Sequence, residues 1–338
     1  MADLFLSLTP EERREALESA FGRGLVRSTA LLEKDVWVVW TLQALFAAPF
    51  ADNLVFKGGT SLSKAYNVIQ RFSEDVDLTY DIRKLADEQA GRPEALADAE
   101  AKSLGRRIRE RLLPRLLDDE IKPYLDAQIA AAGLSATVER EGENLFVAYD
   151  AAADYPAYVR PRVKLEFGAR STGEPATLRS VTCDLAPAFP ELAFPSAMPR
   201  VMRPERTFWE KATLAHVYCL EGKLRGATGF ARHWHDLIRL HEAGFAADAI
   251  SDRNLARAVA DHKAKFFPAK DARNAPVDYH AAIAGRLILI PEGEALVLLK
   301  ADYEAMIAAG YLDGGGESFD ILMRRCGDLQ DRINAAAQ

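Results

Sequence analysis

The sequence has few cysteines, no excess of positive charge and no long hydrophobic run. Its three cysteines, scattered over 338 residues, exclude a disulfide framework and a CxxC zinc site. With 43 Lys and Arg against 50 Asp and Glu, the net charge of -7 gives no overall basic field, so a polyanion would have to bind a local patch. The most apolar early run, residues 36–50, is too short and too polar to span a bilayer. No signal peptide is apparent, and we expect a cytoplasmic protein without a membrane partner.

The remaining composition is that of an ordinary globular protein of about two domains, with 49% hydrophobic and 28% charged residues. Helical patterns cover most of 9–50 and 84–132. Apolar or alternating patterns predict strands at 54–56, 75–80, 144–149, 162–169 and 177–185. Beyond a proline-rich connection, helices are predicted at 205–221, 232–243, 251–265, 292–309 and 318–334. The sequence therefore predicts an α+β core over residues 1–195 and a mostly helical domain over residues 196–338.

Two consecutive glycines follow the first predicted strand. Gly58 and Gly59 would let a phosphate chain approach the backbone, where the N–H groups of the next helix would face it. We expect Thr60 to cap this helix, whose apolar residues recur as far as Ile69. The Walker A spacing is absent, which argues against a P-loop. The glycines therefore indicate a phosphate-binding turn of another kind.

An Asp-x-Asp pattern lies on the next predicted strand. Asp75 and Asp77 are two residues apart, so both side chains project from one face of the strand. Two such carboxylates can hold Mg²⁺ against substrate phosphates. We expect a two-metal site, which would activate an attacking hydroxyl and stabilise a leaving pyrophosphate.

FKGGTSLSKAY followed by RFSEDVDL resembles the signature of AbiEii-type nucleotidyltransferases, the toxin halves of type IV toxin–antitoxin systems. The resemblance extends to EKDVWVVWTLQALF upstream and to ERTFWEKATLAH and RHWHDLIRL downstream. It implies a DNA polymerase β-like nucleotidyltransferase core with a mixed sheet. It also implies a C-terminal helical domain that contributes to the active-site cleft.

The resemblance implies a role for individual residues. Asp75 and Asp77 would bind metal, Lys211 would contact nucleotide phosphates, and Asp236 matches a later aspartate of the family. A third carboxylate is expected on a neighbouring strand, and either Glu166 or Asp236 could complete the acidic set. The nucleotide-binding residues would be Gly58, Gly59, Thr60, Ser61, Ser73 and Lys211.

The function implied is Mg²⁺-dependent transfer of NMP from an NTP to an RNA acceptor, with release of pyrophosphate. The acceptor expected is a tRNA 3′ end, whose modification would block translation and growth. A cognate antitoxin is also implied, and it need not bind this chain. The alternatives are a protein acceptor, an NTP-binding interaction module without turnover, and a metal-dependent phosphohydrolase built on His235 and Asp236.

Several charged residues also have ordinary structural interpretations. Asp236 could simply pair with Arg232 or Arg239 on its own helix, and Lys164 beside Glu166 is typical of a plain charged strand face. Two arginine clusters are candidates for binding, the first as a polyanion-binding face and the second for a phosphate contact by one of its members. Their members are Arg106, Arg107, Arg109, Arg111 and Arg115 in the first, and Arg200, Arg203 and Arg206 in the second.

Overall fold

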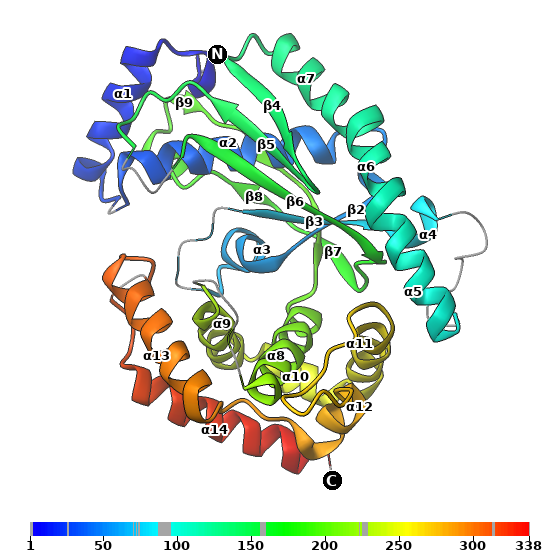
Figure 1. The fold of residues 1–338 in the computed structure, drawn as a ribbon. Coiled ribbons are helices and arrows are strands. Elements are labelled where there is room, and N and C mark those ends of the chain that lie inside the picture. Colours follow the sequence, from blue (N-terminus) through cyan, green and yellow to red (C-terminus); the bar gives the residue numbers. More distant parts are fainter. Residues whose placement is uncertain are drawn as a thin grey trace. The chain divides into compact units, whose positions relative to one another are not determined.

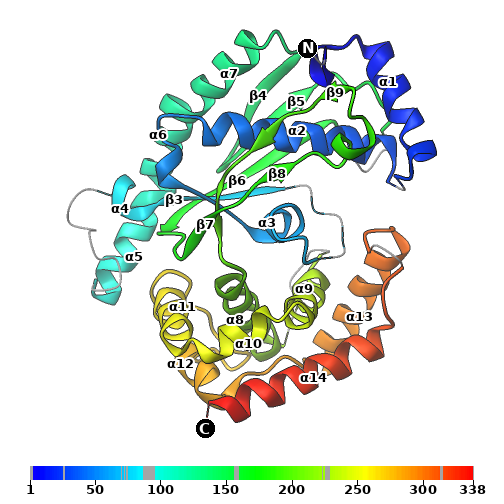
Figure 2. The same cartoon turned by 180° about the vertical axis from the view of Figure 1, so that it is seen from behind.

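The computed structural model describes residues 3–25, 27–69, 71, 73, 75–86, 96–155, 160–222, 224, 229–312 and 315–337. These residues form two compact units. Unit 1 takes its residues from 1–65, 74–91 and 106–201, and unit 2 from 66–73, 92–105 and 202–338. Figure 1 shows the elements of both units, and Figure 2 shows them from behind. In the part of the chain that is described, no helix is long and apolar enough to cross a membrane.

A mixed sheet forms the centre of unit 1. Among the described residues it has seven strands, in the order β4-β5-β6-β3-β2-β11-β7 (Figure 1). Its strands are β2 (Leu54–Lys57), β3 (Val76–Asp81), β4 (Ala136–Glu141), β5 (Asn144–Tyr149), β6 (Arg162–Ser171), β7 (Ala176–Leu178) and β11 (Arg200–Met202). The central strand β3 runs antiparallel to β2 and parallel to β6. Two small sheets pair β1 (Asp3–Leu4) with β9 (Leu192–Ala193), and β8 (Val181–Thr182) with β10 (Ser196–Ala197).

The helices of unit 1 include α2, a long apolar helix that packs against β6. Its Trp37 ring stacks on Tyr149 of β5 at a centroid distance of 4.6 Å, which joins helix and sheet in one core. The first helices are α1 (Pro10–Ser19), α2 (Thr29–Phe46), α3 (Gly58–Lys64) and α4 (Ile82–Leu85). A continuous helical run follows, joined by π-helical turns at Ile108–Leu112 and Leu117–Ile121. It comprises α5 (Asp98–Arg107), most of which belongs to unit 2, and then α6 (Leu113–Leu116) and α7 (Lys122–Ala131) of unit 1.

Strand β6 has one buried face and one polar face. Val163, Leu165 and Phe167 are buried, whereas Lys164 and Glu166 between them are half-buried. Since side chains alternate along a strand, the apolar set enters the core and the polar set lines the opposite face of the sheet. That polar face carries the candidate site.

Unit 2 consists mainly of helices around buried aromatic side chains. Trp209 and Trp234 are fully buried, and their indole N–H groups donate to backbone oxygens of Ala249 and Leu289 at 2.8 and 2.6 Å. These bonds remove the cost of burying a polar indole nitrogen. The helices are α8 (Pro204–Glu221), α9 (Ala231–Glu242), α10 (Phe245–Ser251), α11 (Arg253–Phe266), α12 (Tyr279–Ala281), α13 (Gly293–Ala308) and α14 (Phe319–Ala336).

The predicted α+β class, with a mixed sheet and C-terminal helices, is confirmed. The structure differs from the sequence prediction in several places. The prediction of a single strand at 177–185 was wrong, because two short strands, β7 and β8, form there instead. Strand β4 has no counterpart among the predicted strands. Helix α3 begins at Gly58 and ends at Lys64, so Thr60 lies inside the helix and does not cap it. Unit 1 reaches Val201, whereas the sequence places the domain boundary at residue 195.

Candidate functional site

Three charged side chains form a row across the central strands of unit 1. Asp77 on β3 pairs in register with Glu166 on β6 and with Lys57 at the end of β2. Directly opposed residues have Cβ atoms about 5 Å apart and share one face of the sheet. Asp75 lies two residues before Asp77, immediately ahead of β3. The two aspartates and Glu166, called the acidic set below, are therefore brought to one end of the paired strands.

Gly58 fits closely against the carboxylate of Asp77. Its φ is 78°, in the left-handed region that glycine tolerates and other residues disfavour. A Cβ atom at this position would lie 1.9 Å from Oδ2 of Asp77, far inside the 3.0 Å that real Cβ atoms keep. Only a glycine therefore lets the turn after β2 and the Asp-x-Asp strand come together as they do.

Burial and neighbouring charges perturb Asp77. Burial raises the pKa of Asp77 to about 6, and the nearby carboxylates of Glu166 and Asp75 add to this, while Lys57 opposes it. A side-chain hydrogen bond with Glu166 acts in the same direction as burial. Two carboxylates in contact disfavour two negative charges. A divalent cation would relieve this repulsion, and carboxylate oxygens are the ligands that Mg²⁺ takes.

The donor set is incomplete as a closed metal site. Within the described residues, no three His, Cys, Asp or Glu side chains converge closely enough to hold a metal by themselves. Mg²⁺ in nucleotide sites is commonly held by one or two carboxylates together with substrate phosphates and water. Asp75 and Asp77, with Glu166 in register with Asp77, fit that mode of binding.

The hydroxyl groups after the glycines serve the backbone. Thr60 is buried and donates to the carbonyl oxygen of Asp75 at 2.5 Å, and Ser61 is buried and donates to the carbonyl oxygen of Gly58 at 2.9 Å. The first bond ties helix α3 to the start of the Asp-x-Asp strand. A phosphate would accordingly meet backbone N–H groups here, and the hydroxyls would hold the turn in shape.

The far end of α3 is fixed by a buried ion network. The ammonium of Lys64 lies 2.5 Å from a carboxylate oxygen of Asp35 and 2.7 Å from one of Asp184. The backbone N–H of Asp184 donates to Asp35 at 2.7 Å, and Arg27 pairs with Asp184. Burial alone would lower the pKa of Lys64, but the two carboxylates raise it, so the lysine remains charged. Lys64 thus anchors the glycine helix to α2.

A second ionic cluster lies in unit 2. Asp236 is fully buried and accepts two hydrogen bonds from Arg71, at 2.7 and 2.8 Å, and its Oδ2 lies 2.9 Å from the ammonium of Lys211. Although burial alone would raise the pKa of Asp236, the two cations lower it far below its usual range. Burial also lowers the pKa of Lys211. The sequence interpretation in which Asp236 pairs with Arg232 or Arg239 was therefore wrong.

His235 and His216 are buried and neutral. Burial lowers the pKa of His235 to about 4, and neither ring nitrogen of this residue has a hydrogen-bond partner among the described residues. His216 has a pKa lowered to about 4 by burial, and its Nδ1 accepts the N–H of Ile288 at 3.0 Å. Because Asp236 is committed to two cations, it does not form the metal-binding His-Asp pair of a phosphohydrolase.

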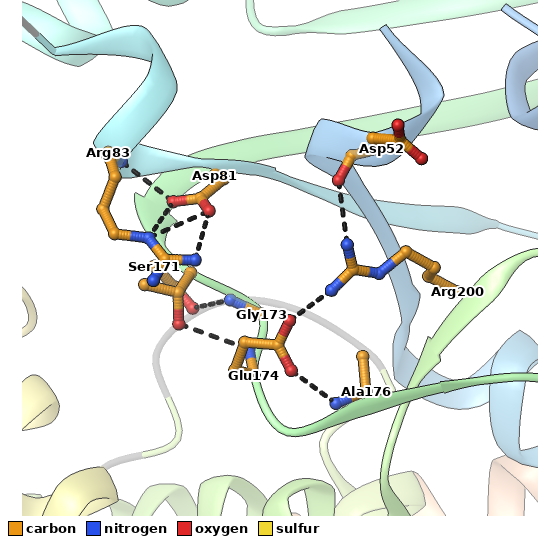
Figure 3. A network of polar contacts seen from close by, with 9 residues as sticks. Asp52, Asp81, Arg83, Ser171, Gly173, Glu174, Ala176 and Arg200 are labelled. Carbon is orange, nitrogen blue, oxygen red and sulfur yellow. Dashed lines mark hydrogen bonds and ion pairs between the residues drawn. The ribbon is translucent and has the colours of Figure 1, made fainter.

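The second arginine cluster is engaged in ion pairs. Figure 3 shows Arg200 between Glu174 and the backbone oxygen of Asp52, to which it donates at 3.0 Å. In the same view Arg83 binds both carboxylate oxygens of Asp81 at the end of β3. Arg203 pairs likewise with Glu205 at 2.8 Å, and Arg206 with Glu210 at 3.0 Å. Each of these arginines is thus paired with a carboxylate of its own unit.

The structure thus brings the predicted site residues together in two groups. Unit 1 contains Gly58, Gly59, Thr60, Ser61, Asp75, Asp77 and Glu166. Unit 2 contains Ser73, which is half-buried, together with Lys211 and Asp236. Two residues that the sequence analysis did not assign to the site join these groups. Arg71 completes the ionic cluster around Asp236, and Lys164 binds Glu166. The alternation of β6 was the available signal for Lys164, since it places both residues on one face.

Unit 1 is an α+β core with carboxylates on adjacent strands, and unit 2 is mostly helical. The family described as "Nucleotidyl transferase AbiEii toxin, Type IV TA system" matches residues 40–325, so the chain belongs to this family of nucleotidyltransferase toxins. No curated protein matches the chain.

Two solved structures are similar to this one. MenT4, a nucleotidyltransferase toxin from Mycobacterium tuberculosis, is 18% identical over 96% of this chain and 89% of its own, with a TM-score of 0.47. JHP933 from Helicobacter pylori is 15% identical over 93% of this chain and 95% of its own, with a TM-score of 0.42.

Proposed function

We propose that this toxin transfers the NMP of a Mg²⁺-bound NTP to an RNA acceptor at the acidic set of unit 1. The observation that carries the proposal is the fit of Asp77 against Gly58, in register with Glu166. Asp75 and Asp77 would hold the cation, which supplies charge neutralisation to the triphosphate. Backbone N–H groups after Gly58 and Gly59 would bind the phosphates, with Thr60 and Ser61 keeping the turn in shape.

The reaction requires little covalent catalysis by the protein. The acceptor hydroxyl oxygen forms a bond to the α-phosphorus, the bond from that phosphorus to the β-bridging oxygen breaks, and pyrophosphate leaves. The hydroxyl proton passes to a carboxylate oxygen of the acidic set. Positioning and electrostatic stabilisation provide the catalysis, as in other phosphoryl transfers. We propose that Lys211 and Asp236 act together in unit 2, with Asp236 orienting the lysine that contacts phosphates, and that Ser73 contributes to nucleotide binding.

We propose a tRNA 3′ end as the acceptor, and support for an RNA comes from two cations of unit 1, Arg170 and Arg109. Arg170 lies four residues beyond Glu166 on β6, so both side chains belong to the same face. Burial lowers the pKa of Arg170, and the like charge of Arg109, on the helical run, lowers it further. Two positive charges that act on one another in this way would attract a polyanion. RNA affinity should therefore fall steeply with salt, and less steeply in Arg109→Ala.

The test is transfer of radiolabel from each NTP in turn to total RNA or to total protein. We expect label in RNA with the wild type and a loss of at least 100-fold in Asp77→Asn. Asp126→Asn is a matched control, because Asp126 pairs with Lys122 on the surface of α7. Label in protein would replace the acceptor proposed here with a protein acceptor. Equal labelling by the wild type and Asp77→Asn would refute the assignment of the site.

A further inference from the structure

Unit 1 contains a cavity of about 320 Å³ that is formed by four segments of the chain. One wall is the face of α2 that carries Trp40 and Gln43. The other walls come from the N-terminal segment 4–7, from residues within 128–134 at the end of α7, and from residues 193–195 at β9. Small-molecule sites enclose about 300–1,000 Å³, so a cavity of this size suits a compact ligand.

Helix α2, and the cavity with it, lies on the face of the sheet that does not carry the acidic set. Trp37 of α2 stacks on Tyr149 of β5, and by alternation Tyr149 shares its face of that strand with Leu145. Leu145 pairs in register with Leu165 of β6, which lies on the face opposite to Glu166. A ligand bound against α2 would therefore not occupy the transfer site.

Two aromatic side chains that line the cavity are packed against aromatic neighbours. The ring of Trp40 meets Trp37 edge-on at a centroid distance of 5.8 Å. Phe194 stacks on Phe5, which is fully buried, at a centroid distance of 5.2 Å. Because these contacts position both rings before a ligand binds, little side-chain entropy is lost on binding. Aromatic faces positioned in this way bind flat rings by stacking.

The polar groups of the cavity are uncharged. Among the described residues that line it there is no acidic or basic side chain, so a phosphate group would find no counter-ion there. The side-chain amides of Gln43 and Gln128 have no hydrogen-bond partner in the described part of the chain. A glutamine amide presents a donor beside an acceptor, which matches the N6 and N7 edge of adenine, whereas guanine is read by arginine or lysine.

We propose that this cavity binds the adenine ring of an uncharged nucleoside, stacked on the aromatic wall and hydrogen-bonded to the glutamine amides. Leu4 supports this occupant, because its side chain lines the cavity and is 58% exposed, and a flat ring seated there would cover it. The site is separate from the acidic set, so the inference goes beyond the proposed function and does not depend on it.

The experiment is a calorimetric titration of the full chain with adenosine. We expect one site per chain and a dissociation constant on the order of 100 μM, which corresponds to the ligand efficiency of molecules of this size. Inosine has a carbonyl oxygen in place of the N6 amino group, and it should bind at least tenfold more weakly. The double variant Gln43→Met/Gln128→Met keeps the length of both side chains but removes their amides. It should bind adenosine at least tenfold more weakly than the wild type does and should no longer distinguish adenosine from inosine.

A second pair of variants locates the site. Ala47 is exposed, follows α2 and lines the cavity, so Ala47→Phe places a ring inside it and should abolish saturable binding. Ala127→Phe adds the same ring at an exposed position of α7 outside the lining, and its dissociation constant should stay within about twofold of the wild type. If Ala47→Phe does not fold, Ala132→Phe fills the cavity from the end of α7.

Each outcome decides for or against the adenine site. No saturable binding of adenosine to the wild type up to about 1 mM, or undiminished binding by folded Ala47→Phe, would overturn the inference. Equal affinities of the wild type for adenosine and inosine would show that the amides do not read the base, and would overturn it too. Loss of binding in Asp77→Asn would place adenosine at the transfer site, with the same result. All of these are binding measurements, so they can fail while the proposed transfer reaction stands.

Discussion

Replacing Gly58 with alanine should disable the proposed site while leaving the fold largely intact. Alanine at φ 78° costs about 1–2 kcal/mol in backbone strain. In addition, the new Cβ would lie 1.9 Å from Oδ2 of Asp77, where real contacts begin at 3.0 Å. The carboxylate must therefore move by more than 1 Å, since the helix and strand on either side are fixed by the Thr60 and Ser61 bonds.

The consequence for activity is larger than the consequence for stability. A misplacement of about 1 Å at a reacting centre can cost about 100-fold in rate, or about 2.7 kcal/mol in the barrier. We therefore expect Gly58→Ala to lower kcat/KM for transfer at least 100-fold. We expect its unfolding free energy to fall by only about 1–2 kcal/mol, measured by urea titration with circular dichroism.

Gly133→Ala is the matched control for this substitution. Gly133 also has a positive φ, of 64°, but nothing lies within 4 Å of the position where its Cβ would be. The unfolding free energy of the control should fall by a similar amount, about 1 kcal/mol, while its kcat/KM for nucleotide transfer should not change. If Gly58→Ala kept at least half of the wild-type rate, or if Gly133→Ala lost as much activity as Gly58→Ala, the close approach to Asp77 would not be what the glycine provides.

Three further predictions concern stability. In the unfolded chain His216 and His235 take up a proton below pH 6.5, whereas in the folded protein their pKa is about 4. The free energy of unfolding is therefore highest above pH 6.5 and decreases as the pH falls, because protonation favours the unfolded chain. Urea titrations should show a loss of about 2 kcal/mol per histidine between pH 8 and pH 5, and a pH-independent midpoint over this range would contradict it. Lys64→Met should destabilise unit 1 by about 3 kcal/mol because it removes the cation from the buried carboxylate of Asp35, and Lys64→Arg should destabilise it less; equal losses would exclude charge as the cause. Asp236→Asn should lower the melting temperature strongly, since Arg71 would keep its charge without a carboxylate; a melting temperature within 2 °C of wild type would show that the cluster is not structural.

Local patterns in the sequence were sufficient for most elements of the fold. The strand at 144–149 and the five helices predicted beyond residue 204 appear within a few residues of their predicted bounds, whereas the short helices α10 and α12 were not predicted. Strand β4 was missed for a physical reason. Only Val138 of its residues is buried, so its sequence carries no apolar alternation, and the strand exists because it pairs with β5. Edge strands of this kind are defined by their partner.

The candidate site was predictable only where it is local. The glycine turn and Asp-x-Asp lie close in sequence, and alternation along β6 pointed to Glu166. The ion pairs connect distant residues, with Arg71 and Asp236 separated by 165 positions, and no spacing rule relates two such residues. Thr60 illustrates the same limit, since its hydroxyl is used by the carbonyl of Asp75 rather than by the start of its own helix.

The path of the chain has a consequence for anyone who wishes to divide this protein. Residues 66–73 and 92–105 belong with the C-terminal helices, although they come early in the sequence. A gene split after residue 201 would give a second fragment without Arg71, leaving Asp236 with half of its salt-bridge partners. Expression of the two halves as independent polypeptides should therefore fail, and complementation should require a break elsewhere, at an exposed turn such as the β4–β5 hairpin at Gly142.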